Sequence, residues 1–201
     1  MKPIIGIIAR PFYSEDKNKI CGSYEEIINS VMLSGGIPIT ILPNNNLNEF
    51  LTLCNGFILQ GGDYFIEYER KVIEYAYSKD IPLLGICLGM QHMGVTFSGE
   101  EFNCLNHKFK NKKYVHEVII DKNSNLYKFL KKDNIRVNSR HKSSIINTNL
   151  SIVGVSSDGI VEAVEDKNKK FFIGVQWHPE SMFNYDKNSR NLFKYFIKIC
   201  I

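Results

Sequence analysis

The sequence lacks several features that would assign it to a common class of protein. Its five cysteines, at positions 21, 54, 87, 104 and 200, form no CxxC pair, which argues against a zinc knuckle or a thioredoxin-like motif. Neither sign of charge dominates, because 25 basic and 21 acidic residues leave a net charge of only +4. Such a mild charge is more typical of a solvated surface than of a nucleic-acid-binding face. We therefore expect no nucleic-acid partner.

Long apolar runs, internal repeats, linkers and low-complexity segments are also absent. The apolar segment near the N-terminus ends at Arg10 and Pro11 and is too short for a signal peptide or a membrane span. We therefore expect a cytoplasmic protein that does not contact a membrane and whose cysteines are reduced. The length suits a single domain over residues 1–201, and 44% hydrophobic residues can bury a core without disulfides or metal.

What the sequence does contain is an alternation of apolar strands and amphipathic helices. In the first half we expect strands at 4–9, 38–42, 56–59 and 82–86, and helices at 24–33, 47–54, 67–78 and from 88 onward. In the second half we expect strands at 115–120, 135–138, 152–156, 160–165 and 171–176, and a final helix at 189–199. This order predicts an α/β fold, doubly wound, with a mostly parallel sheet, helices on both faces and a β-rich C-terminal half.

One apolar strand runs directly into the pattern G-x-C-x-G, at Gly85-Ile86-Cys87-Leu88-Gly89. This is the thiol counterpart of the nucleophile elbow, a sharp strand-to-helix turn that needs glycines beside it for close approach of neighbouring chain. The helix that follows would favour thiolate at its N-terminus. Taken alone, the pattern fits a small buried apolar cysteine equally well.

A second segment, Gly174-Val175-Gln176-Trp177-His178-Pro179-Glu180, ends a buried strand with a histidine and an acid. Residues two apart on an extended chain point the same way, so we expect Glu180 to hold the His178 ring toward a nucleophile elsewhere. A lone histidine at a strand end is more often structural. The presence of the G-x-C-x-G pattern in the same chain shifts the interpretation of His178 toward a catalytic role.

Together these two motifs resemble the signature of class I glutamine amidotransferase domains. Gly61-Gly62-Asp63, residues 137–141 and Val161-Glu162-Ala163 extend the resemblance, which is greatest to the peptidase C26 branch of free-standing γ-glutamyl hydrolases. The resemblance implies that Cys87 is the nucleophile, His178 its base and Glu180 the residue that orients the histidine. It also implies hydrolysis of a γ-glutamyl amide through a glutamyl thioester, without a cofactor.

The same resemblance assigns the groups around the reacting carbonyl. Backbone N–H groups of Gly62 and Leu88 would form the oxyanion hole, and Gln91 would recognise the glutamyl group. The loop Arg140-His141-Lys142-Ser143 would hold the α-amino and α-carboxylate groups. Arg140 could add a charge there, although a solvated arginine is as good an interpretation, and His141 could act behind the loop. We expect no metal ion, because the other histidines (92, 107 and 116) look scattered and carry no argument for catalysis.

Departures from the family pattern concern the leaving group. Leu88 replaces the arginine found after the cysteine in many C26 members, and the loop after Gly62 is short and aromatic. We expect Tyr64, Phe65 and Tyr68 to face the leaving group, the alternative being that they pack into the core. The partner would be a small γ-glutamyl substrate, such as γ-glutamyl-GABA or γ-glutamyl-CDP-amidate.

Two other functions stay open at this point. One is a glutaminase subunit that delivers ammonia to a separate synthetase, and the other is a catalytically inactive binding domain on the same fold. The intact residues Cys87, His178 and Glu180 argue against the second. A homodimer also remains open.

Overall fold

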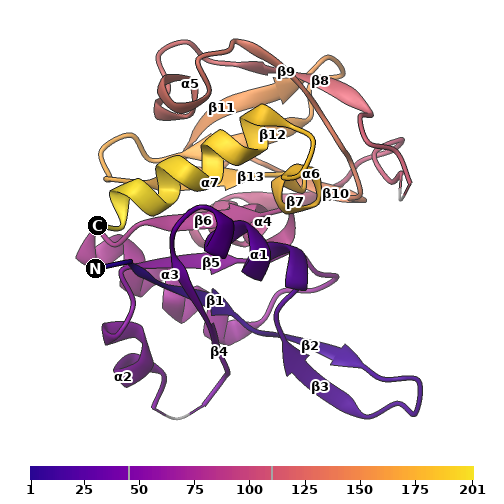
Figure 1. Ribbon diagram of the computed structural model, residues 1–201. Coiled ribbons are helices and arrows are strands. Elements are labelled where there is room, and N and C mark those ends of the chain that lie inside the picture. The colour runs from indigo at the N-terminus through magenta and orange to yellow at the C-terminus, as the bar shows by residue number, and fades with distance from the viewer. Residues whose placement is uncertain (45, 110) are drawn as a thin grey trace.

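A nine-stranded mixed sheet is the centre of the computed structural model, which describes residues 1–44, 46–109 and 111–201 (Figure 1). In spatial order its described strands are β4 (Ile37–Ile41), β1 (Ile4–Ile8), β5 (Gly56–Leu59), β6 (Leu83–Ile86), β13 (Phe172–Val175), β12 (Val161–Glu165), β11 (Ser151–Ser156), β8 (His116–Ile120) and β9 (Asn134–Val137). The first five are parallel, and the last four extend the sheet with antiparallel pairs.

Helices cover both faces of this sheet, as the alternating pattern predicts. Successive side chains of a strand point to opposite faces, so Ile5 and Ile7 of β1 join one apolar cluster while Ile8 joins the other. The first cluster is completed by α1 (Glu25–Leu33), α5 (Asn125–Leu130), α6 (Pro179–Met182) and α7 (Lys187–Ile199). The second is completed by α2 (Leu47–Thr52), α3 (Glu67–Lys79) and α4 (Leu88–Thr96). The predicted α/β architecture is confirmed.

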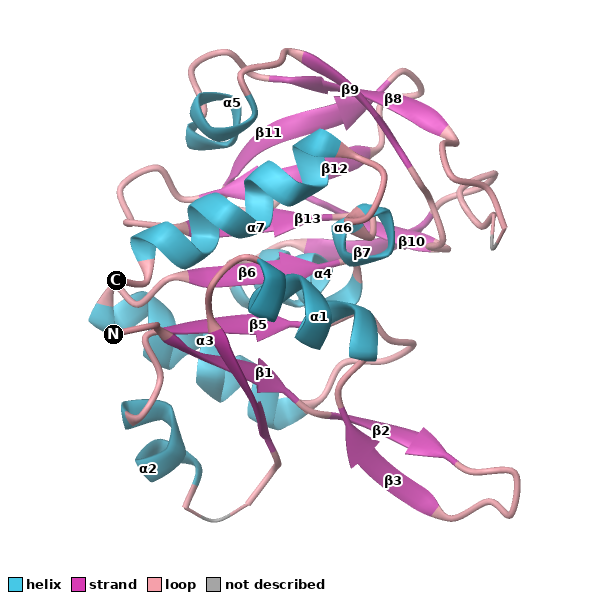
Figure 2. Ribbon diagram, viewed as in Figure 1, coloured by secondary structure: helices cyan, strands magenta, loops and turns pink. Residues whose placement is uncertain are grey.

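The parallel strands direct their carboxyl ends to one edge of the sheet. Both chain termini lie at the opposite edge, from which β5, β6 and β13 run (Figure 2). Taken in chain order, the five parallel strands are arranged 2-1-3-4-5, a doubly wound order in which ligands bind beyond the carboxyl ends. The loops after β1, β5, β6 and β13 therefore meet at the edge where a site is expected.

Two small two-stranded sheets were not predicted. One joins β2 (Arg10–Tyr13) to β3 (Lys19–Gly22) and projects from the body of the molecule (Figure 1). The other joins β7 (Glu100–Asn103) to β10 (Ser143–Ile146). In the first, Pro11 suggests the end of a strand, and in the second the partners are 40 residues apart, so neither pairing has a local signal. The final helix starts at Lys187, because the Asp186 carboxylate accepts the Ser189 N–H at 2.6 Å and caps it.

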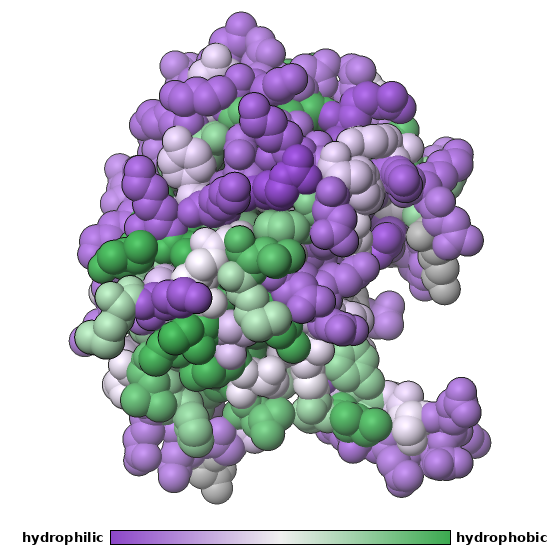
Figure 3. Space-filling model, in the orientation of Figure 1, coloured by the Kyte–Doolittle hydropathy of each residue, from purple (hydrophilic) through white to green (hydrophobic). Residues whose placement is uncertain are grey.

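The surface is mostly polar, with apolar side chains gathered over the region of α1 and β4 (Figure 3). Exposed apolar residues there include Met32, Leu33 and Ile37. Within the described residues, no helix combines the length and the apolar composition that a membrane crossing needs.

Candidate active site

Cys87 lies at the sharp turn between β6 and α4. Its backbone has φ 53° and ψ −107°, a conformation that L-residues rarely adopt and that is typical of functional sites. Its N–H donates to the carbonyl of Val175 at 2.8 Å, which holds the turn against β13. A Cβ added at Gly89 would overlap the backbone of Leu59, so this glycine is required for the close packing of α4 on β5. The side chain of Gln176 donates to the Cys87 sulfur at 3.6 Å.

His178 and Glu180 lie one turn beyond β13, at the start of α6. His178 is the N-cap of this helix, and its Nδ1 lies 2.7 Å from Oε1 of Glu180. The expected contact is present, but the expected extended backbone is not, because Pro179 starts a helical turn that carries Glu180 back to the ring.

Asn138 fixes the backbone of His178 from the opposite side. Its side-chain oxygen accepts the His178 N–H at 2.8 Å, and its amide donates to the His178 carbonyl at 2.9 Å. Both backbone polar groups of His178 are therefore satisfied by one buried side chain. The sequence places Asn138 in the matched 137–141 segment but does not indicate this role.

Gly61 and Gly62 follow β5 and pass close to the reactive side chains. A Cβ added at Gly61 would lie 2.9 Å from Cε1 of His178 and 3.5 Å from Cβ of Cys87. A Cβ at Gly62 would overlap the guanidinium of Arg10. Both positions therefore require glycine because of close neighbours, and their backbone φ angles are not in the left-handed region.

A buried charged network supports this glycine turn, and the sequence did not predict it. Arg10 donates to the Glu69 carboxylate at 2.7 Å and also to the carbonyl of Tyr64. The second oxygen of Glu69 lies 2.9 Å from Nδ1 of His92. All three side chains are buried, and removing one partner of a buried pair leaves an uncompensated charge at a cost of about 3–5 kcal/mol. Their placement behind Gly62 indicates a positioning role.

Two cavities share a wall that includes Cys87. The first, of about 510 Å³, contains His178 and Glu180, and the second, of about 430 Å³, contains Leu88 and Gln91. Both are lined by Gly62, Asp63, Cys87, Lys108 and Arg140.

All the residues predicted to bind substrate line the second cavity. They are Gln91, Arg140, His141, Lys142 and Ser143. The amide nitrogen of Gln91 donates to the Ser143 carbonyl at 2.7 Å and to Oε1 of Gln176 at 3.0 Å. Any bond from Gln91 to a bound group must therefore be accepted by its side-chain oxygen. Arg140 is half-buried and donates to Ser181 at 3.0 Å, so it is held in place and is not a freely solvated side chain.

Comparison with known proteins identifies the family. The family model of Peptidase C26 matches residues 66–180, which is more than half of the chain. The chain belongs to the Peptidase C26 family. It is 27% identical to the γ-glutamyl-γ-aminobutyrate hydrolase of Escherichia coli strain K12, over 98% of this chain and 93% of the relative. It is also 29% identical to CTP synthase of Borreliella afzelii, over 98% of this chain but only 48% of that enzyme.

A solved structure shares the fold of this C26 protein. The glutaminase domain of Trypanosoma brucei CTP synthase with bound acivicin superimposes with a TM-score of 0.68, at 18% identity, over 98% of this chain and 93% of that one. The α/β assignment therefore has both a geometric and a comparative basis.

Burial alone would lower the pKa of His178 in this C26 protein. The Glu180 carboxylate and Cys87 outweigh burial and raise the pKa to about 10. The ring is therefore protonated at neutral pH, beside the Cys87 sulfur.

The other three buried cysteines lie in surroundings that raise the pKa of their thiols. All five cysteines are free, and burial raises the pKa of the Cys54 and Cys104 thiols to about 11 and that of Cys200 to about 12. These thiols stay protonated and poorly reactive at neutral pH.

Two expectations about this C26 protein are wrong. Tyr64, Phe65 and Tyr68 do not line either cavity, and Phe65 packs against His92, with ring centroids 5.0 Å apart. The first cavity is instead lined by Tyr24 and Glu26, from the start of α1. Nor are the histidines scattered: the rings of positions 107, 116 and 141 gather around Glu162.

Proposed function

We propose that this C26 protein hydrolyses γ-glutamyl amides, with Cys87 as nucleophile. The observation that carries the proposal is the position of Cys87 in the wall that two cavities share. One cavity holds the His178–Glu180 pair, and the other holds Gln91 and the loop that ends at Ser143. An acyl group in the second cavity and an amine in the first would place the scissile amide at the sulfur.

The arrangement supports a double displacement. The proton of Cys87 resides on the His178 ring, so the sulfur attacks the γ-carbonyl as a thiolate, and the resulting oxyanion is stabilised by the backbone N–H groups of Gly62 and Leu88. The protonated His178 ring then gives its proton to the departing amine, which leaves a glutamyl thioester on Cys87. A water molecule, deprotonated by His178, attacks the thioester, which releases glutamate and restores the Cys87 thiolate beside the protonated His178 ring. Glu180 keeps the ring oriented and stabilises its charged form throughout.

The size of the first cavity, about 510 Å³, favours a leaving group larger than ammonia. Tyr24 offers an aromatic ring, and the lining carries charges of both signs, with Lys108 and Arg140 beside Glu26, Asp63 and Glu180. The Nε of Arg140 is buried and has no hydrogen-bond partner within the described residues. The Arg140 guanidinium can bind an anionic group of the leaving group, such as the carboxylate of an amine or the phosphoramidate of a nucleotide. The proposed substrates are therefore conjugates of the γ-glutamyl-GABA or γ-glutamyl nucleotide amidate type.

One observation favours a second function. The similarity to CTP synthase extends over nearly the whole chain, and the solved glutaminase domain shares its fold. A glutaminase subunit that passes ammonia to a separate synthetase would use the same residues on free glutamine. The size of the first cavity argues for the conjugate hydrolase, because ammonia would fill only a small part of its volume of about 510 Å³.

A comparison of kcat/KM for glutamine, γ-glutamyl-GABA and a γ-glutamyl nucleotide amidate separates the two functions. We expect a conjugate to exceed glutamine, since contacts of the remote half can stabilise the transition state. A clear preference for glutamine would transfer the assignment to the ammonia-supplying subunit.

The nucleophile itself is tested separately. Cys87→Ala should abolish turnover of every substrate, and acivicin, followed by peptide mass spectrometry, should label Cys87 ahead of the four other cysteines. Near-normal turnover in Cys87→Ala, or preferential labelling of another cysteine, would remove the proposed mechanism.

A further inference from the structure

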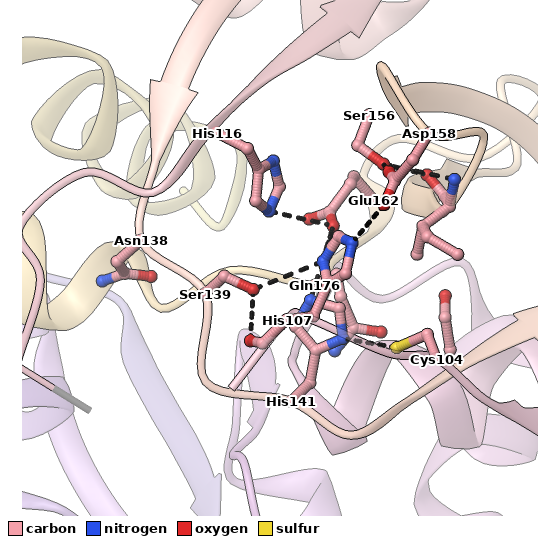
Figure 4. A network of polar contacts seen from close by, with 12 residues as sticks. Cys104, His107, His116, Asn138, Ser139, His141, Ser156, Asp158, Glu162 and Gln176 are labelled. Atoms are coloured by element: carbon pink, nitrogen blue, oxygen red, sulfur yellow. Dashed lines mark hydrogen bonds and ion pairs between the residues drawn. The ribbon is translucent and has the colours of Figure 1, made fainter. Parts of the chain in front are cut away.

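A buried cluster of three histidines and one glutamate lies beside the loop 140–143, which we call the substrate loop (Figure 4). Its members come from separate segments: the β7–β8 connection, the first residue of β8, the β9–β10 connection and β12. They are His107, His116, His141 and Glu162. One ring nitrogen of each histidine lies 3.4 to 3.5 Å from Oε1 of Glu162, and the four ligand atoms are all within 4.8 Å of one another. The proposed hydrolysis uses only His141 of this set, as a cavity wall.

The outer nitrogen of each ring faces a hydrogen-bond acceptor. These acceptors are the Asp158 carboxylate for His107 (2.9 Å), the Ser143 carbonyl for His141 (3.0 Å) and the Glu117 carbonyl for His116 (3.3 Å). An imidazole that donates outward presents a lone pair inward. When every ring donates outward, all three inner nitrogens direct lone pairs at the Glu162 carboxylate, and such an arrangement requires a positive charge at its centre. Two other contacts lie beside these rings: Ser139 Oγ is 3.4 Å from Nδ1 of His107, and Cys104 Sγ is 3.5 Å from Nδ1 of His141.

Several polar atoms of the cluster have no hydrogen-bond partner. Among the described residues these include both carboxylate oxygens of Glu162 and the Nε2 atoms of His116 and His141. Glu162 is fully buried and His141 is only 4% exposed, so water does not satisfy them cheaply. A buried carboxylate without partners is destabilising unless a cation or metal compensates it. Oε1 of Glu162 lies 3.4 Å from both of these nitrogens, so at least these three atoms face one small space.

We propose that His107, His116, His141 and Glu162 bind one Zn²⁺ ion. Imidazole and carboxylate ligands at about 2.0–2.1 Å from a tetrahedral zinc lie about 3.3–3.4 Å from each other, close to the nitrogen–oxygen separations in the cluster. Outward hydrogen bonds from zinc-bound histidines to carboxylate and carbonyl oxygens are the usual support for such ligands. Four protein ligands form a closed, structural site.

This site would act on the substrate loop through His141. The ring belongs to the loop 140–143, which lines the second cavity, and its Nδ1 also holds the Ser143 carbonyl that Gln91 binds. The zinc ion would join this loop to β8 and β12 of the antiparallel extension. It would thereby fix the wall of the cavity from behind, without contact with the reacting atoms.

The experiment measures zinc on the full chain and separates this cluster from the thiol site. Chelator-treated protein is equilibrated with ZnCl₂ at micromolar free zinc, and bound metal is measured by inductively coupled plasma mass spectrometry. We expect one zinc per chain in the wild type and in Cys87→Ser. In His116→Gln we expect affinity to fall roughly tenfold or more. His116 is the least buried ligand, with a side chain 15% exposed, which makes it the mildest ligand to replace.

A spectroscopic measurement keeps the test decisive if His116→Gln does not fold. Co²⁺ added to chelator-treated wild type should give the visible bands of a tetrahedral ion without the near-ultraviolet absorption of thiolate ligation. Zinc should also raise the Tm of chelator-treated wild type. Zinc that is lost in Cys87→Ser but kept in His116→Gln would overturn the proposal, because the metal would then lie at the thiol. Absence of zinc binding by the wild type would overturn it as well. The positive charge beside Glu162 would then come from protonated histidines of the cluster.

Discussion

Replacement of Gly61 by alanine tests how closely the glycine turn confines the His178 ring. The new Cβ would lie 2.9 Å from Cε1 of His178, whereas ordinary contacts are 3.4–4 Å. The ring must therefore move by about 0.5–1.1 Å, or the turn must move by the same amount. A misplacement of this size in a catalytic constellation costs on the order of 10²-fold in rate, equivalent to about 2.7 kcal/mol. The backbone of Gly61 suits alanine, so strain in φ adds nothing.

The assay is steady-state hydrolysis of a chromogenic γ-glutamyl anilide, accompanied by thermal unfolding. Gly61→Ala should lower kcat far more than it changes KM, and overpacking should lower the free energy of unfolding by about 1–3 kcal/mol. Gly22→Ala is the matched control, because its Cβ would meet only Phe12, at 3.9 Å. A Gly61→Ala protein that keeps more than about a third of wild-type kcat/KM would refute the argument that this turn confines the ring.

Three further predictions concern the groups that hold His178. Glu180→Gln keeps a hydrogen-bonding group beside the ring and should lose less kcat than His178→Ala, which deletes the proton carrier; equal losses in two folded proteins would assign Glu180 a more direct role. The Glu180 carboxylate raises the pKa of His178, so its protonated form is lost only as pH rises through about 10. In Glu180→Gln the alkaline limb of kcat/KM should therefore move to lower pH, and an unmoved limb would contradict this cause. Asn138→Ala removes both bonds to the His178 backbone and should lower kcat about 10–100-fold, with Asn138→Asp intermediate; wild-type kinetics in Asn138→Ala would show that α6 alone positions the ring.

Local sequence signals predicted the strands that carry the site. Buried parallel strands such as β5 and β6 read as continuous apolar runs, and the turn residues after them stand out. Cys87 and His178 could be paired from the sequence because each follows such a strand, and because the family resemblance supplied their relation. The contact between His178 and Glu180 was predicted for the wrong reason, since two-residue periodicity does not apply in a helical turn.

The features that were missed depend on pairing between distant segments. Arg10 meets Glu69 only because β1 and β5 are neighbours and α3 packs over their ends. The histidines join Glu162 because the antiparallel strands β8 and β12 lie on either side of β11. No periodicity in a single segment carries such information, and a histidine without a local motif resembles any other polar residue.

The pairing of β6 with β13 has a consequence for how the protein is made. This pairing aligns residues 83–86 with residues 172–175, so the loops that carry the thiol and the imidazole are adjacent only when the two strands are joined. During synthesis, Cys87 leaves the ribosome long before its partner. Parallel pairing over such a separation forms slowly, because a long loop must be closed first. The nascent chain therefore carries an unpaired β6 edge. The candidate site is assembled only after the last quarter of the chain has folded onto the sheet.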